Sequence, residues 1–123
     1  MEEEEKQIHP FIDKRIEDYC EKYHSEEEKG LYDLRRQTYL HFVRPYMISG
    51  AWQGELLKFL VKIIQPKRVL EVGTFSGYST LCFALASNDD CMIDTVEAME
   101  EYKDFLIDMF SKNNVINKIK LHF

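Results

Sequence analysis

The sequence predicts an α/β fold in which N-terminal helices precede the first half of a doubly wound parallel sheet. Over residues 1–64, apolar side chains recur at spacings of three and four, as on amphipathic helices. Beyond Pro66 the pattern becomes strand, glycine turn, helix, strand, helix and strand, which is the order of a doubly wound sheet. The length of 123 residues suits one small domain.

Three helices are expected before the sheet. The first falls within residues 1–28 and starts near Pro10, and the acidic run 2–5 is either a favourable first turn or a frayed tail. Its apolar stripe consists of Ile8, Phe11, Ile12, Ile16 and Tyr19. The second helix begins after Ser25 as N-cap and ends at Arg44-Pro45, because the residue before a proline resists helical geometry.

The third helix opens at Ser49-Gly50 and continues to about Ile64. Its expected buried face consists of Leu56, Leu57, Leu60, Ile63 and Ile64. Residues 1–45 are therefore expected to form a helical segment, and residues 46–123 the first half of the α/β domain.

Short apolar runs bounded by turn residues predict three strands with a helix in each interval. The first strand covers 68–72 and is expected to be buried, the second covers 91–97, and the third covers 118–123. Helices are expected over 77–87 and 99–112. A three-stranded half-sheet leaves an edge and apolar helix surface uncovered, so we expect this chain to be the N-terminal part of a longer protein.

Charge and cysteine content exclude several classes of protein. The net charge is −6, and residues 1–28 carry −7 while residues 29–123 carry +1. An acidic chain is not expected to bind nucleic acid or an anionic membrane surface. The three cysteines show no C-x-x-C spacing, so no disulfide framework or zinc site is expected. No segment has the pattern of a signal peptide or a membrane span, and a cytoplasmic protein is predicted.

The most informative segment is residues 69–79, where a strand enters a glycine turn that leads into a helix. In a doubly wound sheet, ligands bind outside the carboxyl ends of the strands, beside this turn. Gly73 lets the backbone turn tightly, and Gly77 lets the helix start pack near the strand. Free N–H groups at the helix start are suited to a carboxylate.

The ligand at this turn is predicted to be S-adenosylmethionine rather than NAD. The glycines form G-x-x-x-G instead of the dinucleotide pattern G-x-G-x-x-G. Glu71, just before the turn, disfavours a pyrophosphate and suits a ligand that carries ammonium and sulfonium groups. Glu97 ends the next strand, 24 residues beyond Gly73, where an acidic side chain accepts hydrogen bonds from ribose hydroxyls. Ala98 and Met99 are then expected to border the adenine.

At these residues the sequence resembles the cation-dependent small-molecule O-methyltransferases, the group that includes the catechol and caffeoyl-CoA O-methyltransferases. The resemblance extends from about Arg44 to Phe123. It rests on two separated motifs, residues 47–57 and 70–79, followed by Glu97. It implies a Rossmann-like S-adenosylmethionine-dependent methyltransferase fold, truncated after the third strand, with N-terminal helices.

The resemblance also implies the cofactor contacts. The implied cofactor-binding residues are Met47, Ser49, Glu71, Gly73, Thr74, Tyr78, Ser79 and Glu97. Met47 and Ser49 would line the methionine end, Ser79 would lie near its carboxylate, and Glu97 would hold the ribose. From the residues themselves, a structural alternative stays open for four of these positions. In these alternatives, Glu71 is a buried carboxylate satisfied by backbone N–H groups, Met47 is core filler, Ser79 is a plain residue of the first helical turn, and Glu97 is an ordinary acid at a strand end.

By the same resemblance, the divalent cation and the lysine that act on the acceptor hydroxyl belong to segments later than Phe123. No catalytic and no metal-binding residue is therefore predicted in this chain. The complete protein would transfer a methyl group to a small hydroxylated, catechol-like acceptor and form a homodimer. Two other functions stay open: a non-catalytic nucleoside-binding or assembly module, and a nucleotide-dependent oxidoreductase, which the glycine spacing and Glu71 disfavour.

Overall fold

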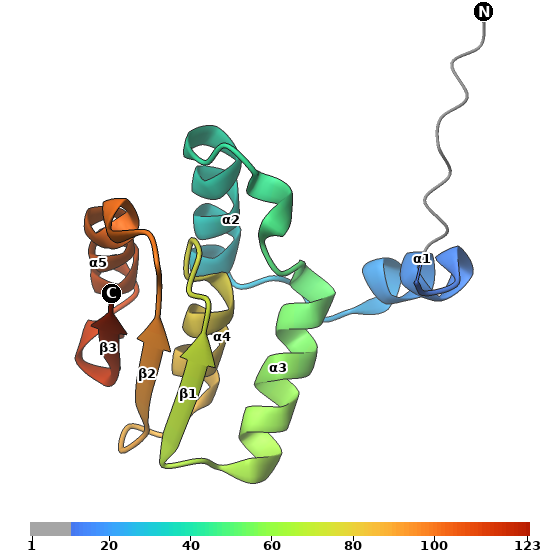
Figure 1. The fold of residues 1–123 in the computed structure, drawn as a ribbon. Coiled ribbons are helices and arrows are strands. Elements are labelled where there is room, and N and C mark those ends of the chain that lie inside the picture. The colour runs from blue at the N-terminus through green and yellow to red at the C-terminus, as the bar shows by residue number, and fades with distance from the viewer. Residues whose placement is uncertain (1–10) are drawn as a thin grey trace, which may run out of the picture.

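The computed structural model describes residues 11–123, so Ile8, Pro10 and the acidic run 2–5 lie outside the described residues. The elements follow one another in the predicted order of helices and then alternating strands and helices (Figure 1). Their bounds are Lys14–Tyr23 (α1), Lys29–His41 (α2), Ala51–Ile64 (α3), Arg68–Val72 (β1), Tyr78–Ala86 (α4), Met92–Val96 (β2), Lys103–Lys112 (α5) and Ile119–His122 (β3). Short 3-10 helices occur at Pro45–Met47, Glu100–Tyr102 and Ile116–Lys118. The predicted α/β class is confirmed.

The strands form a parallel sheet in the order β1-β2-β3. Val72 pairs with Val96, and Val96 pairs with His122, so the carboxyl ends of the strands meet at one edge. Helices α4 and α5 cover one face of the sheet (Figure 1). On the other face of β1, Leu70 and Val72 are 73% and 82% exposed. The prediction that β1 is a buried strand is therefore wrong, because only alternate residues of β1 face the helices.

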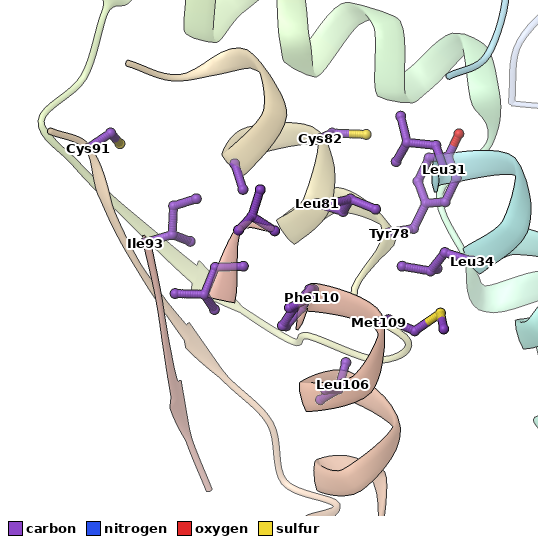
Figure 2. Packing of buried hydrophobic residues seen from close by; sticks show 13 residues of the cluster. Leu31, Leu34, Tyr78, Leu81, Cys82, Cys91, Ile93, Leu106, Met109 and Phe110 are labelled. Carbon is purple, nitrogen blue, oxygen red and sulfur yellow. The ribbon is translucent and has the colours of Figure 1, made fainter. Parts of the chain in front are cut away.

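The hydrophobic core lies between the sheet and helices α2, α4 and α5. Leu34 from α2, Leu81 from α4 and Phe110 from α5 are fully buried, and Ile93 of β2 meets them from the sheet. Figure 2 shows these side chains gathered in one interior. Helix α2 thus joins the same core as the glycine turn and its helix.

Helix α1 makes no contribution to that core. Asp13 caps it by accepting a hydrogen bond from the Arg15 backbone N–H at 2.9 Å. None of its residues is buried, and Ile16 and Tyr19 of the predicted apolar stripe are exposed. In Figure 1 it extends away from the body of the molecule. No helix in residues 11–123 is long and apolar enough to cross a membrane.

Helix α2 begins later than predicted, at Lys29 with Glu28 as its N-cap, and Ser25 is not the cap. The backbone at Glu28 is still extended. The two glutamates just before the helix form ion pairs: Glu27 pairs with Arg35, and Glu28 pairs with Lys58. An N-cap at Ser25 would have placed both glutamates in the first turn of the helix, whereas they form these ion pairs from the segment before it.

Helix α3 has the predicted bounds but not the predicted buried face. Leu56, Leu60, Ile63 and Ile64 are exposed, and the buried positions are Gly54, Lys58 and Val61. Gly54 decides the orientation because α3 packs closely on α4 there. A Cβ at position 54 would lie 3.0 Å from both Cys82 Sγ and the Tyr78 ring.

Candidate functional site

The loop between β1 and α4 is held in an unusual backbone conformation. Gly73, Phe75 and Gly77 have φ angles of +98°, +51° and +88°. The backbone N–H groups of Gly73 and Thr74 both donate to the Val96 carbonyl, at 2.8 and 3.2 Å, which ties the loop to the end of β2. A Cβ on Gly77 would also lie 2.7 Å from the Phe110 ring, so this position needs glycine for space as well as for its φ angle.

Helix α4 starts directly after this loop and directs its first N–H groups toward it. The first α-helical bond runs from the Leu81 N–H to the Gly77 carbonyl at 2.9 Å. Within residues 11–123, the backbone N–H groups of Tyr78, Ser79 and Thr80 have no hydrogen-bond acceptor. These groups form the positive end of the helix and are suited to an anionic group.

Two neighbouring cavities lie along the loop and share Met47, Gly73 and Phe75 in their walls. The smaller, of about 60 Å³, lies at the start of α4. The larger, of about 630 Å³, reaches Glu97 at the end of β2. We call the two together the loop cleft: it is narrow beside α4 and wide beside β2.

Glu97 lies in the wall of the wide end and is almost completely buried. One carboxylate oxygen accepts from the Phe75 backbone N–H at 2.7 Å, and the other accepts from the Met99 backbone N–H at 2.9 Å. These two bonds fix the carboxylate and leave each oxygen with capacity for one further donor. A pair of adjacent hydroxyls is the kind of group that such a carboxylate binds.

Glu71 lies behind the loop and is not among the residues that line either cavity. Its carboxylate accepts from the hydroxyls of Ser79 at 2.5 Å, Thr95 at 2.7 Å and Thr80. Because the Thr95 proton is given to Glu71, the 2.6 Å bond between Thr74 and Thr95 must be donated by Thr74. The alternative in which backbone N–H groups satisfy Glu71 is thus wrong: side-chain hydroxyls do so.

The connection between α2 and α3 forms the opposite wall of the cleft. Met47 borders both cavities, and Ser49 borders the narrow one. Met47 is 59% exposed, so the alternative that it is core filler is wrong. Thr74, Tyr78 and Ser79 also border the narrow cavity. The structure therefore brings seven of the eight predicted residues to the loop cleft and places Glu71 directly beneath it.

Tyr78 has a partner that the sequence did not indicate. Its hydroxyl donates to Glu27 Oε1 at 2.6 Å, and Glu27 also forms an ion pair with Arg35 at 2.7 Å. Burial and the adjacent Glu27 carboxylate raise the pKa of Tyr78, so the phenol stays protonated and donates this bond. Burial raises the pKa of Glu27, but Arg35 and Tyr78 outweigh that effect and hold it below its ordinary value.

The wide end of the cleft has further walls that sequence spacing did not identify. Met99 was expected there, beside the adenine, and it does border this cavity. The additional lining residues are Val43, Arg44, Glu101 and Tyr102, which lie beside Phe75 of the glycine turn. Phe75 contacts Phe42 and Tyr102 edge-on, with ring centroids 5.1 and 6.0 Å apart. These contacts help to hold Phe75 at its positive φ angle.

Other reactive groups take no part in the cleft. Cys82 is buried against α3, and burial raises the pKa of its thiol to about 12, which keeps it protonated. Among residues 11–123 there is no group of three or more His, Cys, Asp or Glu side chains that could hold a metal ion. Cys82 is therefore not an activated nucleophile, and the groups that line the cleft are binding groups.

Comparisons with known proteins agree on one family. A family model described as O-methyltransferase matches residues 21–123. The chain is 36% identical over 93 residues to caffeoyl-CoA O-methyltransferase of Stellaria longipes, covering 76% of this chain and 38% of that protein. It is 30% identical over 90 residues to probable caffeoyl-CoA O-methyltransferase 3 of Dictyostelium discoideum, covering 72% and 36%. The chain therefore spans less than two fifths of these two curated relatives.

Solved structures give the same result for the fold. A Podospora anserina methyltransferase with bound SAH superimposes with a TM-score of 0.80 and 29% identity, covering 88% of this chain and 47% of that one. An O-methyltransferase from Streptomyces achromogenes, involved in tomaymycin synthesis and solved with SAM, has a TM-score of 0.76 and 27% identity, covering 88% and 48%. The chain corresponds to about half of each structure.

Proposed function

The chain belongs to the O-methyltransferase family, and from this membership we propose that it binds S-adenosylmethionine in the loop cleft for methyl transfer to a hydroxyl oxygen. The observation that carries the proposal is the position of Glu97. Its carboxylate is fixed by two backbone N–H groups at the wide end of the cleft. The solved structures with bound SAH and SAM support the choice of cofactor.

The cleft suits both ends of this cofactor. At the wide end, Glu97 would accept the two ribose hydroxyls, and the cavity of about 630 Å³ beside Met99 would hold the adenine. At the narrow end, the N–H groups that begin α4 and the Ser49 hydroxyl would hold the carboxylate. The wide cavity is lined by one basic side chain, Arg44, and by two acidic ones, Glu97 and Glu101, so its walls lack the positive charge that a phosphate group favours.

Bound S-adenosylmethionine supplies an electrophilic methyl group on a sulfonium sulfur. The residues of this chain would bind and orient it, and Phe75 and Met47 would exclude water from the middle of the cleft, where the two cavities meet. We assign no catalytic or metal-binding role to residues 11–123. A divalent cation that acts on the acceptor hydroxyl is part of the proposal for the whole protein.

The proposed acceptor is a small hydroxylated compound, probed first as a catechol. Support comes from the relatives named as caffeoyl-CoA O-methyltransferases and from the Val43 side chain and the Tyr102 ring beside the wide cavity. A homodimer and a cytoplasmic location are proposed with it. A non-catalytic nucleoside-binding module is the second candidate, because the chain's polar groups converge on a nucleoside-sized cavity.

Calorimetric titration of the 123-residue chain with S-adenosylhomocysteine, and with NAD as a control, tests the proposal. We expect binding of S-adenosylhomocysteine only. Loss of one charge-assisted pair costs about 1.5–3 kcal/mol, so Glu97→Ala should weaken binding by about 10- to 100-fold. Glu100→Ala is the matched control, because Glu100 is exposed and lies outside the cleft.

Circular dichroism must show that each variant is folded before its affinity is compared. Preference for NAD, or a folded wild-type chain that does not bind S-adenosylhomocysteine, would rule out the proposed cofactor site. Equal losses in Glu97→Ala and Glu100→Ala would remove Glu97 from it. Methylation of catechol by the whole protein with Mg²⁺ then separates the enzyme from the binding module.

A further inference from the structure

The bond between Tyr78 and Glu27 joins two segments that are 51 residues apart in the sequence. Tyr78 is the first residue of α4, and Glu27 lies in the segment between α1 and α2. Both side chains are mostly buried: the residue Tyr78 is 2% exposed, and the Glu27 side chain is 10% exposed. The bond is therefore shielded from water. A charge-assisted hydrogen bond is stronger in such a buried position than in water.

Tyr78 is held on two sides. Its ring packs against Gly54 of α3, where a Cβ would lie 3.0 Å from the ring carbon Cε1. Its hydroxyl is held by Glu27, and Glu27 is in turn held by Arg35 of α2 through contacts of 2.7, 3.1 and 3.3 Å. Helix α3 and, through Glu27, helix α2 thus fix the orientation of a side chain that belongs to α4.

The position of Tyr78 matters because it borders the narrow end of the loop cleft. The same residue carries the first of the three backbone N–H groups that begin α4 without an acceptor in the described part of the chain. A shift of Tyr78 would therefore move both the wall of this cavity and the groups that meet the anionic end of a ligand.

We propose that Glu27 is a positioning residue for the amino-acid end of the cofactor, acting through the Tyr78 hydroxyl. This inference rests on the proposed function and assigns to the N-terminal segment a part in that site. Glu27 lines neither cavity of the loop cleft, so its effect on a ligand passes through Tyr78, which borders the narrow end. Binding groups at the wide end, Glu97 above all, do not depend on it.

Two ligands test whether the effect of Glu27 is restricted to the narrow end of the loop cleft. S-adenosylhomocysteine carries the amino-acid end, and 5′-methylthioadenosine has the same nucleoside but lacks that end. We would titrate both into the 123-residue chain and into Glu27→Ala and Tyr78→Phe. Each variant should weaken S-adenosylhomocysteine by about tenfold and change the affinity for 5′-methylthioadenosine by less than about twofold.

Glu28→Ala is the matched control. Glu28 is the next residue, also a glutamate, and it anchors the same segment to α3 through a 2.9 Å ion pair with Lys58. It forms no hydrogen bond with Tyr78, whose hydroxyl donates to Glu27. It should leave the affinity for both ligands unchanged. The double variant Glu27→Ala with Tyr78→Phe should lose no more affinity than either single variant, because both remove the same bond.

The outcomes separate this inference from the proposed function. A folded wild-type chain that binds neither ligand would overturn both. Wild-type binding that Glu27→Ala leaves unchanged would overturn the positioning role alone. Equal losses for the two ligands, or an equal loss in Glu28→Ala, would make Glu27 a structural anchor of the segment without a role at the narrow end.

Discussion

Gly73 and Gly77 carry different constraints although they belong to one loop. Both have positive φ angles, but a Cβ at Gly73 would meet no atom within 4 Å, whereas a Cβ at Gly77 would meet the Phe110 ring at 2.7 Å. Gly73 is therefore constrained by its backbone angle alone. Gly77 is constrained by its backbone angle and by the close approach of α5.

Replacement by alanine should separate these two constraints. Gly73→Ala should lower the free energy of unfolding by about 1–2 kcal/mol, the cost of a side chain in a left-handed conformation. Gly77→Ala adds overlap with Phe110, which costs about 1–3 kcal/mol more. Urea denaturation followed by circular dichroism measures both. Equal losses for the two variants would show that Phe110 moves aside without cost.

Residues with local signals were the ones that sequence reasoning could place at the cleft. Gly73 and Gly77 follow a strand directly, and Glu97 ends the next strand, so the fold class brings them to one edge. Glu27 has no such signal, because its contact with Tyr78 depends on how α2 and α4 pack. The three hydroxyl groups that donate to Glu71 could not be predicted from the sequence either, because serine and threonine are common and these three follow no characteristic spacing.

At the scale of elements, the residues at which a helix begins and ends were easier to predict than the side of the helix that is buried. Helix α3 begins and ends where Gly50 and Gln65-Pro66 indicate. Its apolar residues surround most of the helix, so periodicity could not select the side that packs. Gly54 determines which side of α3 is buried, because its lack of a side chain lets α4 pack closely at that position. Helix α2 started later than expected because Glu27 and Glu28 form tertiary ion pairs.

The link from the α1–α2 segment to α2 and α4 should make stability depend on pH. The pKa of Glu27 in the folded protein lies below its ordinary value of 4.5. Its contribution is therefore complete above that ordinary value and is lost as the pH falls through the lower, folded-state pKa. Urea denaturation at pH 7 and pH 3 should show a smaller decrease for Glu27→Gln than for the wild-type chain. Parallel decreases would contradict this role.

At the scale of the whole molecule, the apolar surface is unevenly distributed. Leu70 and Val72 on β1 are exposed, as are Phe59, Ile63 and Ile64 on α3. β1 is also an edge strand whose outer side has no partner strand in the described sheet. Apolar edge strands and large apolar patches favour association with other chains.

We therefore expect the 123-residue chain to associate in a concentration-dependent way. Leu70→Lys should reduce the association seen by analytical ultracentrifugation at micromolar concentrations, because it places a charge on the exposed sheet face. Leu40→Lys is the control with the same charge change: Leu40 is 63% exposed but lies on α2. An equal reduction by both substitutions would point to net charge rather than to the sheet face.

The sequence of helix α1 is weakly constrained by the folded core. It buries no side chain, and the ion pairs that it forms within residues 11–123, Lys14 with Asp18 and Arg15 with the N-cap Asp13, join neighbours along the chain. Residues 14–23 can therefore diverge among descendants of this sequence without disturbing the core. If Ile16 and Tyr19 stay apolar in those descendants, the cause must be a contact of this helix outside the core, because neither side chain is buried in it.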